Sequence, residues 1–298
     1  MKISVIILNW NRPNDTIAAV ESALAQRFDD FDVLIWDNAS SDNSKQVLTD
    51  RFRGQPRVRL TFADANYGVA GGRNRAFRAA DGQLLLSLDS DAVIESPDAL
   101  SKVTTRMQQD PSIGVVSFEV KRPDGHLMWP FSRPAAHWRD KEFETIRMDG
   151  CAFAVRREAF ERVGGFAEHF SPYGAEDQHF AAKLMGAGYR VLYFPAAAVI
   201  HAWSEGGRTA EQFTLHVRNR LWVPIELFPF PYSLISSGKL GISLLRDALQ
   251  EHQVRSFIRG LKRTVTEFRF SHRQPIPLRE WRRMRRIIAE DKALAAPR

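Results

Sequence analysis

The segment Leu84-Leu85-Leu86-Ser87-Leu88-Asp89-Ser90-Asp91 sets the expected architecture of the chain. Its nearly unbroken apolar run predicts a strand buried on both faces, which is typical of a parallel sheet. Successive side chains of an extended strand alternate, so Asp89 and Asp91 are expected on one side. Two such acids are often merely solvated in a turn. After a buried strand, however, their mutual repulsion favours a bound cation, and carboxylates suit Mg²⁺ or Mn²⁺.

Earlier segments repeat this arrangement of an apolar strand, a polar cluster and a helix. Strands are predicted at 2–8, 32–36 and 58–62, and a further strand at 113–118. The alternation predicts an α/β fold with a Rossmann-like, mostly parallel sheet flanked by helices and joined by right-handed crossovers. Ligands of such sheets bind beyond the carboxyl ends of the strands, where these polar clusters lie. The pattern therefore predicts a nucleotide or small-ligand site.

The later segments carry two further candidates. Glu176 and Asp177 begin a predicted helix, where acids serve either as N-terminal stabilisers or as a general base. His201 directly follows a strand-like run, which makes it a candidate metal ligand, although a lone histidine is more often structural. The glycine-containing segment at 202–208 is a candidate lid. Residues 121–147 have no clear period and are predicted to form a long functional loop.

Composition and charge separate the C-terminal part from the rest. Residues 232–298 carry 15 Lys and Arg against 6 Asp and Glu, whereas residues 1–231 carry 27 against 29. Apolar residues at helical spacing in the basic part predict amphipathic helices, which either lie on an anionic membrane or pack on the catalytic domain or a second subunit. No nucleic-acid-binding motif accompanies the charge. The single cysteine and the lack of an apolar run of about 18 residues favour a cytoplasmic location, with peripheral attachment to the inner membrane face as an option.

Six motifs, in order, resemble glycosyltransferase family 2, the inverting enzymes of GT-A fold, and especially its bacterial rhamnosyltransferase-like members. The motifs are SVIILNWNR, DNASSDNS, NYGVAGGRN, LLLSLDSDAVI, GCAFAVRREAFERVGGF with the later YGAED, and AAAVIH. The resemblance covers about residues 1–230. It implies a nucleotide-sugar-binding half at about 1–118 and an acceptor half at 119–230, followed by a basic helical extension at 231–298.

The resemblance also implies roles for individual residues. Those expected on the donor side are Asn9, Asn11, Asp37, Asn66, Arg73 and Asp89, with Asp37 reading a uracil or thymine edge. Asp91 and His201 are expected to bind Mn²⁺ or Mg²⁺, and Asp177 to act as the base. Glu176 and Trp129 are expected on the acceptor side. Many relatives read E-D-x-D where this chain has Glu176-Asp177-Gln178-His179, so the chain departs from the family pattern on the acceptor side.

The expected activity is transfer of a sugar from a UDP- or dTDP-sugar to a saccharide or lipid-linked acceptor, in polysaccharide or glycolipid assembly. A D-x-D phosphatase is a weaker alternative, because its motif normally ends the first strand and here it ends the fourth. A non-catalytic sugar-nucleotide-binding scaffold is the other alternative. The presence of Asp91, Asp177 and His201 argues against it.

Overall fold

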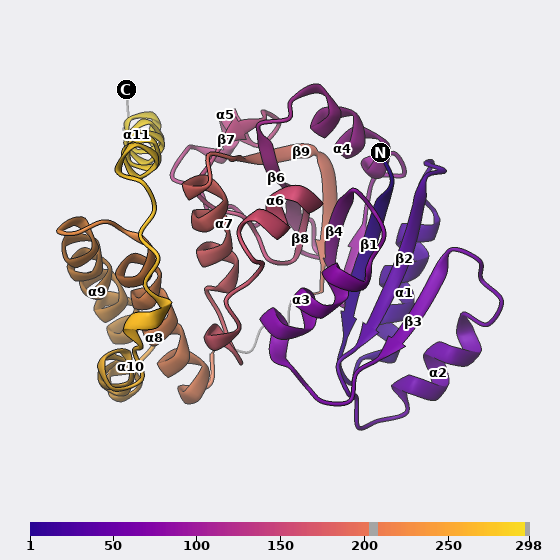
Figure 1. Ribbon diagram of the computed structural model, residues 1–298, viewed down its shortest axis with the longest axis horizontal. Helices are drawn as coiled ribbons and strands as arrows, with labels where there is room; N and C mark the ends of the chain where they lie inside the picture. Colours follow the sequence, from indigo (N-terminus) through magenta and orange to yellow (C-terminus); the bar gives the residue numbers. More distant parts are fainter. Residues whose placement is uncertain (203–207, 296–298) are drawn as a thin grey trace.

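The computed structural model describes residues 1–202 and 208–295. The candidate lid falls mostly on residues 203–207, which lie outside this part. The first half of the chain forms the predicted parallel unit (Figure 1), with strands paired in the order β3-β2-β1-β4. Its strands are β1 (Ile3–Asn9), β2 (Phe31–Asp37), β3 (Val58–Phe62) and β4 (Leu84–Asp89). Its helices are α1 (Pro13–Leu24), α2 (Ser44–Arg51) and α3 (Gly68–Ala79).

The second half extends this sheet with strands of both directions. β8 (Ala152–Arg156) lies between β4 and β6 (Ile113–Lys121) and is antiparallel to both. β9 (Arg190–His201) runs parallel to β6. Short β5 (Ala92–Ile94) and β7 (Phe143–Glu144) are antiparallel to β9. Most of the described strands therefore share one direction, as predicted, and β8 is the long exception.

Alternate residues of the central strands face two separate cores, which is why these strands read as continuous apolar runs. Val5 and Ile7 of β1 pack with α1 and with α4 (Ala99–Gln109) on one face. Ile6 packs on the opposite face with α3, α6 (Arg157–Arg162) and α7 (Glu176–Gly186). The sheet is thus held rigidly between helices, and its strand ends form a fixed platform.

The structure corrects one geometric expectation about the acidic pair. β4 ends at Asp89, and Ser90 and Asp91 form the turn that leads into β5. The alternation of an extended strand therefore does not apply to Asp91. The two carboxylates still lie near one another, because the turn folds Asp91 back beside the end of β9, where Ala202 N donates to Asp91 O at 2.8 Å.

The segment at 121–147, predicted as a loop, is partly ordered by aromatic packing. It contains the short helix α5 (Ala135–Trp138) and strand β7. The Trp129 ring lies edge-on to Phe143 and Tyr193, with centroids 6.0 and 5.3 Å apart. Because Trp129 is part of this anchor on β9, its contact with an acceptor stays a prediction.

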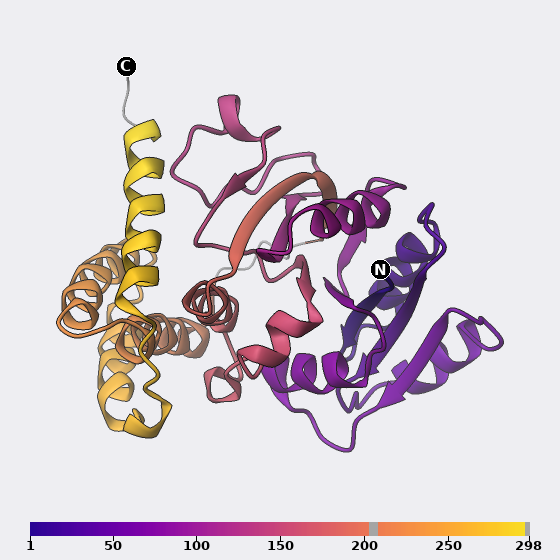
Figure 2. The same ribbon diagram turned by 45° about the horizontal axis from the view of Figure 1, so that its top comes forward.

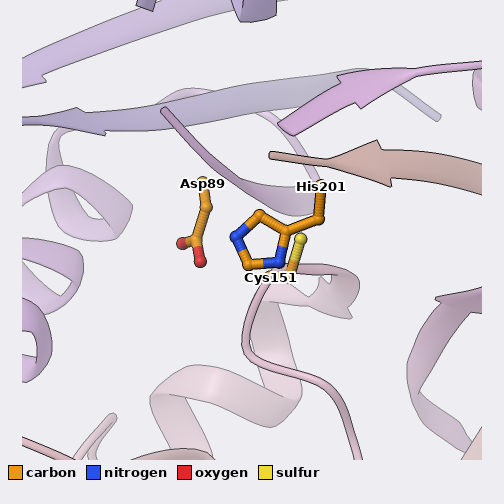
Figure 3. A group of neighbouring side chains, drawn as sticks. All are labelled: Asp89, Cys151 and His201. Carbon is orange, nitrogen blue, oxygen red and sulfur yellow. The ribbon is translucent and has the colours of Figure 1, made fainter. Parts of the chain in front are cut away.

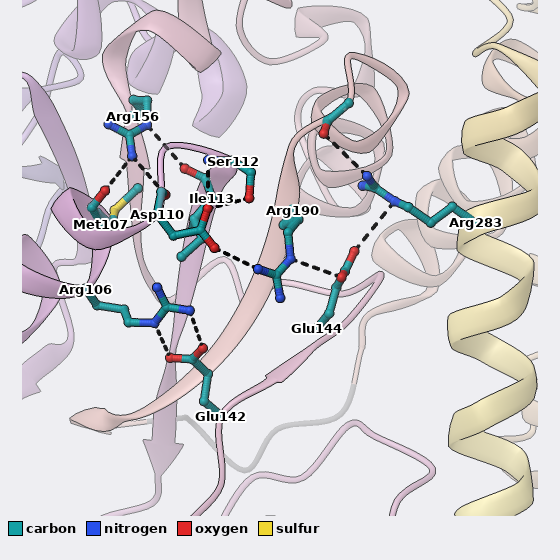
Figure 4. Close-up of polar contacts among 11 residues, drawn as sticks. Arg106, Met107, Asp110, Ser112, Ile113, Glu142, Glu144, Arg156, Arg190 and Arg283 are labelled. Atoms are coloured by element: carbon teal, nitrogen blue, oxygen red, sulfur yellow. Dashed lines mark hydrogen bonds and ion pairs between the residues drawn. The ribbon is translucent and has the colours of Figure 1, made fainter.

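Ion pairs fasten the same region to its neighbours (Figure 4). Arg190 binds Asp110 at 2.8 Å and Glu144 at 3.1 Å, while Arg283 of α11 (Leu278–Ala295) lies 3.6 Å from Glu144. Arg106 binds both carboxylate oxygens of Glu142. The C-terminal helix is therefore tied to β7 by charge and to α7 by apolar packing.

A layer of helices lies beside the sheet domain on the side away from β3 (Figures 1 and 2). It consists of α8 (Ala210–Leu227), α9 (Tyr232–Gln250), α10 (Val254–Thr266) and α11, with one-turn 3-10 helices η1 (Glu168–Phe170) and η2 (Phe270–His272) nearby. A Cβ added at Gly260 would lie 2.6 Å from Val217 Cβ, so α10 approaches α8 as closely as glycine allows. The helical layer begins at α8, before residue 231, where the sequence analysis placed the start of the C-terminal extension. That domain boundary stays a prediction.

The C-terminal helices bury only part of their apolar surface. Trp281, Met284 and Ile287 of α11 join the core that contains α7. Much apolar surface on α9, α10 and their flanks remains exposed: Phe230, Leu234, Ile235, Ile242, Leu249, Ile258, Val265 and Phe270. Among the helices of the described residues, none has the length and apolar character needed to cross a membrane. Packing on the sheet domain thus accounts for one face of these helices, and the apolar residues named above stay exposed among the residues that the structure describes.

Candidate active site

Asn9 and Asp37, at the ends of β1 and β2, form a buried polar network. Asn9 Nδ2 donates to Asp37 Oδ2 at 2.6 Å, and Thr16 Oγ1 donates to Asn9 Oδ1 at 2.8 Å. Ser40 N and Ser40 Oγ both donate to Asp37, at 2.9 and 2.7 Å. Asn9 is fully buried, so it orients the Asp37 carboxylate. Direct contact of Asn9 or Asp37 with a nucleoside stays a prediction.

Asn11 occupies a left-handed backbone conformation, with φ of 56°, which asparagine tolerates better than most residues. Its Oδ1 accepts from Ser41 N at 2.8 Å, which ties the loops after β1 and β2 together. Arg12 follows and forms an ion pair with Asp91. The sequence interpretation assigned no role to Arg12, although it closes the NWNR motif directly after a strand.

Asn66 shapes the loop before α3. Its Oδ1 accepts from Asn38 Nδ2 and from Gly68 N, both at 2.8 Å. Gly68 has a φ of +67°, and a Cβ there would lie 2.7 Å from Ser171 Oγ. The glycine is thus required both by the backbone and by the close approach of the segment before α7.

Arg73, which points from α3, connects the end of β4 to the loop before β8 and to the start of α7. Its Nη2 donates to Asp89 Oδ1 and to Gly150 O, both at 2.7 Å, and its Nη1 lies 3.5 Å from Glu176 Oε1. The side chain is 4% exposed. Within the described residues, Nη1 has no hydrogen-bond acceptor. A buried guanidinium nitrogen in this state favours an additional acceptor from a ligand.

Asp89, Asp91 and His201 come together at the ends of β4 and β9 (Figure 3 shows Asp89 and His201 with Cys151). His201 Nε2 and Asp91 Oδ1 are 3.2 Å apart. Burial alone would raise the pKa of Asp91 and lower the pKa of His201. The hydrogen bond between the two side chains outweighs burial, so the pKa of Asp91 is lowered and the pKa of His201 is raised. Burial, opposed by Arg73 and reinforced by Asp91, raises the pKa of Asp89 to about 6.

This group fits a divalent cation by the chemistry and spacing of its donors. Ligand atoms of Asp89, Cys151 and His201 all lie within 4.8 Å of one another. Asp91 Oδ1 lies beside this group, hydrogen-bonded to His201 Nε2 at 3.2 Å, so Asp91 and His201 would be the residues to hold an ion. Carboxylate oxygens with one imidazole suit Mn²⁺ or Mg²⁺ better than thiolate-preferring ions. Burial raises the pKa of Cys151 well above its usual value, so its thiol is a poor ligand.

Asp177 and Glu176 lie at the start of α7, facing Arg73 across Gly150. A Cβ added at Gly150 would lie 3.6 Å from Arg73 Nη1 and 3.8 Å from Asp177 Oδ2. Burial and the neighbouring Glu176 charge raise the pKa of Asp177 to about 7. A carboxylate with this pKa is well suited to accept a proton near neutral pH.

A pocket of about 520 Å³ opens at this platform. Three of the predicted residues line it, namely Asn66, Asp89 and Asp91. Leu8, Trp10, Arg12, Asn38 and Tyr173 also line it and had no predicted role. Trp10 is 55% exposed, which is unusual for a tryptophan and typical of a ring that stacks on a ligand. Asn9, Asn11, Asp37 and Arg73 support the pocket wall rather than forming it.

Two family models match this chain, and the first covers more than half of it. Residues 4–164 match the family described as glycosyl transferase family 2, and residues 133–202 match the N-terminal domain of galactosyltransferase. An O-antigen biosynthesis protein of Myxococcus xanthus is 28% identical over 81% of this chain and 21% of its own length. An N-acetylglucosaminyl-diphospho-decaprenol L-rhamnosyltransferase of Mycobacterium tuberculosis is 26% identical over 62% of this chain and 71% of its own. The chain thus spans about a fifth of the Myxococcus protein.

Solved structures share the arrangement of elements at low identity. A mannosyltransferase from Pyrobaculum calidifontis, in complex with GDP-Man and Mn²⁺, superposes with a TM-score of 0.64 at 19% identity, covering 90% of this chain and 88% of that one. S. aureus TarS in complex with UDP-GlcNAc gives 0.61 at 19% identity, covering 100% and 82%. These likenesses establish the fold.

Proposed function

Because the chain belongs to glycosyl transferase family 2, we propose that it moves a sugar from a UDP- or dTDP-sugar to an acceptor hydroxyl, with inversion at the anomeric carbon. One observation carries the proposal. Asp89, which lines the pocket with Asp91, accepts a hydrogen bond from Nη2 of the buried Arg73. A Cβ on Gly150 would lie 3.6 Å from Arg73 Nη1 and 3.8 Å from Asp177 Oδ2, so the same arginine lies close to both carboxylates. In-line displacement needs a leaving-group site and a base that flank the sugar, and two carboxylates gathered around one arginine can supply them.

On the donor side, the residues around the pocket divide the recognition between them. The network of Asn9 and Ser40 fixes the Asp37 carboxylate for a base edge, and Trp10 offers a ring for stacking. Arg73 holds the side chain of Asp89 in place, and its Nη1, which is paired in charge with Glu176 at 3.5 Å but makes no hydrogen bond within the described residues, can donate to an oxygen of the sugar. The donor is thereby oriented before any bond is broken.

Asp91 and His201 would hold Mn²⁺ or Mg²⁺. When bound, such an ion supplies a Lewis acid that neutralises charge on a departing diphosphate. Arg12, paired with Asp91, adds a fixed positive charge at the same place. Asp177 accepts the proton of the acceptor hydroxyl, and Glu176, held by Arg73, orients the acceptor. A positioned carboxylate base contributes about 10²–10⁴-fold in rate.

The same geometry disfavours the two alternatives. A phosphatase would need Asp89 as a free nucleophile, yet its Oδ1 accepts a hydrogen bond from Arg73. A buried carboxylate whose pKa burial and Glu176 raise to about 7, close to the Arg73 that also binds Asp89, favours a catalytic role over a scaffold. A screen of nucleotide sugars by thermal shift, with and without Mn²⁺, tests the proposal. Metal-dependent stabilisation by a UDP- or dTDP-sugar is expected, and its absence for every donor would refute the proposal.

The pKa of Asp177 predicts how transfer depends on pH. Its base form is the deprotonated one, and burial with Glu176 raises the pKa to about 7. We therefore expect kcat to rise with pH and to level off above about pH 7. The measurement is kcat at saturating donor and acceptor from about pH 5 to about pH 9. A profile that stays flat through this range would remove Asp177 from the role of base.

We also propose that the exposed apolar face of α9 and α10 rests on an anionic membrane and brings the enzyme to a lipid-linked acceptor. The basic surplus of residues 232–298 supports this, because Lys and Arg near an anionic surface each contribute about 1 kcal/mol. The exposed residues Ile258, Val265 and Phe270 would enter the interface.

Flotation with anionic vesicles tests this attachment. The full chain should float, and Val265→Glu with Phe270→Glu should not, since each charge opposes insertion. Phe62→Glu, at an exposed apolar residue of β3, is the matched control and should float like the wild type. If the wild type stays at the bottom and instead forms a dimer that the double substitution dissociates, the face is a subunit interface.

A further inference from the structure

A second cavity, separate from the donor pocket, lies between α7, α8, α9 and α11. Its volume is about 290 Å³. Its apolar wall includes Val223, Leu240, Trp281 and Met284. Trp281 is held in place by stacking on Tyr232, with ring centroids 3.8 Å apart. The cavity exists because α11 returns across the end of the helical layer, so both the sheet domain and the C-terminal helices build it.

Cationic side chains gather around this apolar wall. They are Arg147, Arg220, Lys239, Arg285 and Lys292. Among the residues that the structure describes, no carboxylate forms an ion pair with any of the five. Many arginines elsewhere in the chain are paired, for example Arg106 with Glu142 and Arg218 with Glu267. A set of unpaired cations around one cavity favours an anionic ligand.

Among these cations, Arg220 gives the strongest reason to expect an anionic ligand. It lies half-buried on α8. Burial, and next the charge of Arg147, lower the pKa of Arg220, while Asp177 opposes them. A guanidinium that is partly removed from water beside another cation is costly unless an anion joins them. Two arginines can together bind a phosphate through charge-assisted, bidentate hydrogen bonds.

The cavity adjoins the acceptor side of the reaction centre. Gln178, which lines it, directly follows Asp177 on α7. Arg147 lies three residues before Gly150, the residue between Arg73 and Asp177. The charge of Asp177 also acts on Arg220, so a ligand held by Arg220 would lie within reach of the base.

We propose that Arg147 and Arg220 bind the phosphate or diphosphate of an acceptor whose apolar chain lies along the wall formed by Leu240, Trp281 and Met284. The inference rests on the proposed transfer to an acceptor hydroxyl and assigns the chemical class of that acceptor: a phosphorylated isoprenoid-like lipid that carries the sugar. The cations set the specificity for the phosphate, and the apolar wall sets it for the chain. The donor pocket, which contains Asp91, takes no part.

The test measures the binding of farnesyl diphosphate by calorimetry. EDTA is present so that the donor site holds no metal. Farnesol and inorganic diphosphate serve as probes of the two halves of the ligand. Farnesyl diphosphate should bind at least about 10-fold more tightly than either probe. Arg147→Ala and Arg220→Gln should each weaken it by about 10-fold or more, the value for loss of one charge-assisted hydrogen bond.

Matched variants separate this site from non-specific attraction to a basic surface. Arg285→Ala removes a cation of α11 that lines the cavity. Arg282→Ala removes an exposed cation of the same helix that does not line the cavity. Only the first should weaken binding. Arg147 is exposed, so Arg147→Ala tests the site without disturbing the core even if Arg220→Gln unfolds the chain.

Two results would overturn the assignment: unchanged affinity in Arg147→Ala, or displacement of farnesyl diphosphate by UDP. The thermal shift with nucleotide sugars and Mn²⁺ is measured on the same protein. Donor stabilisation without binding of farnesyl diphosphate rejects this cavity as the acceptor site and leaves the proposed transfer standing. Binding of farnesyl diphosphate without any donor stabilisation rejects the proposed transfer instead.

Discussion

Replacing Asp177 with asparagine should reduce kcat by about 10²–10⁴-fold and leave donor binding intact. Asparagine keeps the size of the side chain and its acceptor oxygen, which the backbone N–H of Gln178 uses at 2.8 Å. It cannot take the proton of a hydroxyl. The measurement is transfer under saturating substrates, with the thermal shift by nucleotide sugar and Mn²⁺ as the binding readout.

Glu176→Gln is the matched variant for this result. Its carboxylate lies one residue away and pairs with Arg73 at 3.5 Å, so its loss should disturb the acceptor more than the chemistry. We expect a higher KM for the acceptor, with the rise of kcat near pH 7 retained. Turnover within tenfold of the wild type in Asp177→Asn, or loss of the pH limb only in Glu176→Gln, would move the base to Glu176.

Replacing Asp91 with asparagine should abolish the effect of Mn²⁺ on donor binding. The Asp91 carboxylate offers a divalent cation a full negative charge, and the amide oxygen of asparagine is a much weaker ligand. Loss of one group that stabilises transition-state charge typically costs about 10²–10³-fold in kcat. Both the thermal shift with Mn²⁺ and kcat are measured.

Asp124→Asn, an exposed acid in the 121–147 segment, is the control and should behave like the wild type. Asp91→Asn also releases Arg12, so Arg12→Gln is measured in parallel. If Mn²⁺ still strengthens donor binding in Asp91→Asn, the metal does not use Asp91.

The fold was predictable where each strand is buried on both faces. The apolar runs that form β1, β2 and β4 have too few polar residues for a sheet with one face in water. A parallel sheet covered on both faces, with polar clusters at the strand ends, therefore follows from the sequence. The predicted GT-A fold is confirmed by its match to solved glycosyltransferases. The direction of β8 was not predictable, because its five residues fit either orientation. Its pairing with β4 and β6 depends on segments that lie far from it in the sequence.

The site was predictable to the extent that it lies at strand ends. Asp89 and Asp37 follow directly from that rule. Arg12 and Trp10 were overlooked although they belong to a quoted motif, because their role depends on how the loop after β1 bends through Asn11. The cavity between α7 and α11 has no local signal at all. It arises only when helices more than a hundred residues apart pack together.

Arg73 limits how the two halves of the molecule can move. One buried guanidinium contacts Asp89 at the end of β4, Gly150 in the loop before β8, and Glu176 at the start of α7. Moving these elements apart would leave a buried charge without its partners, which is costly. The structure therefore favours entry of substrates past the loops over a hinge between these elements, with the groups around Arg73 already in place.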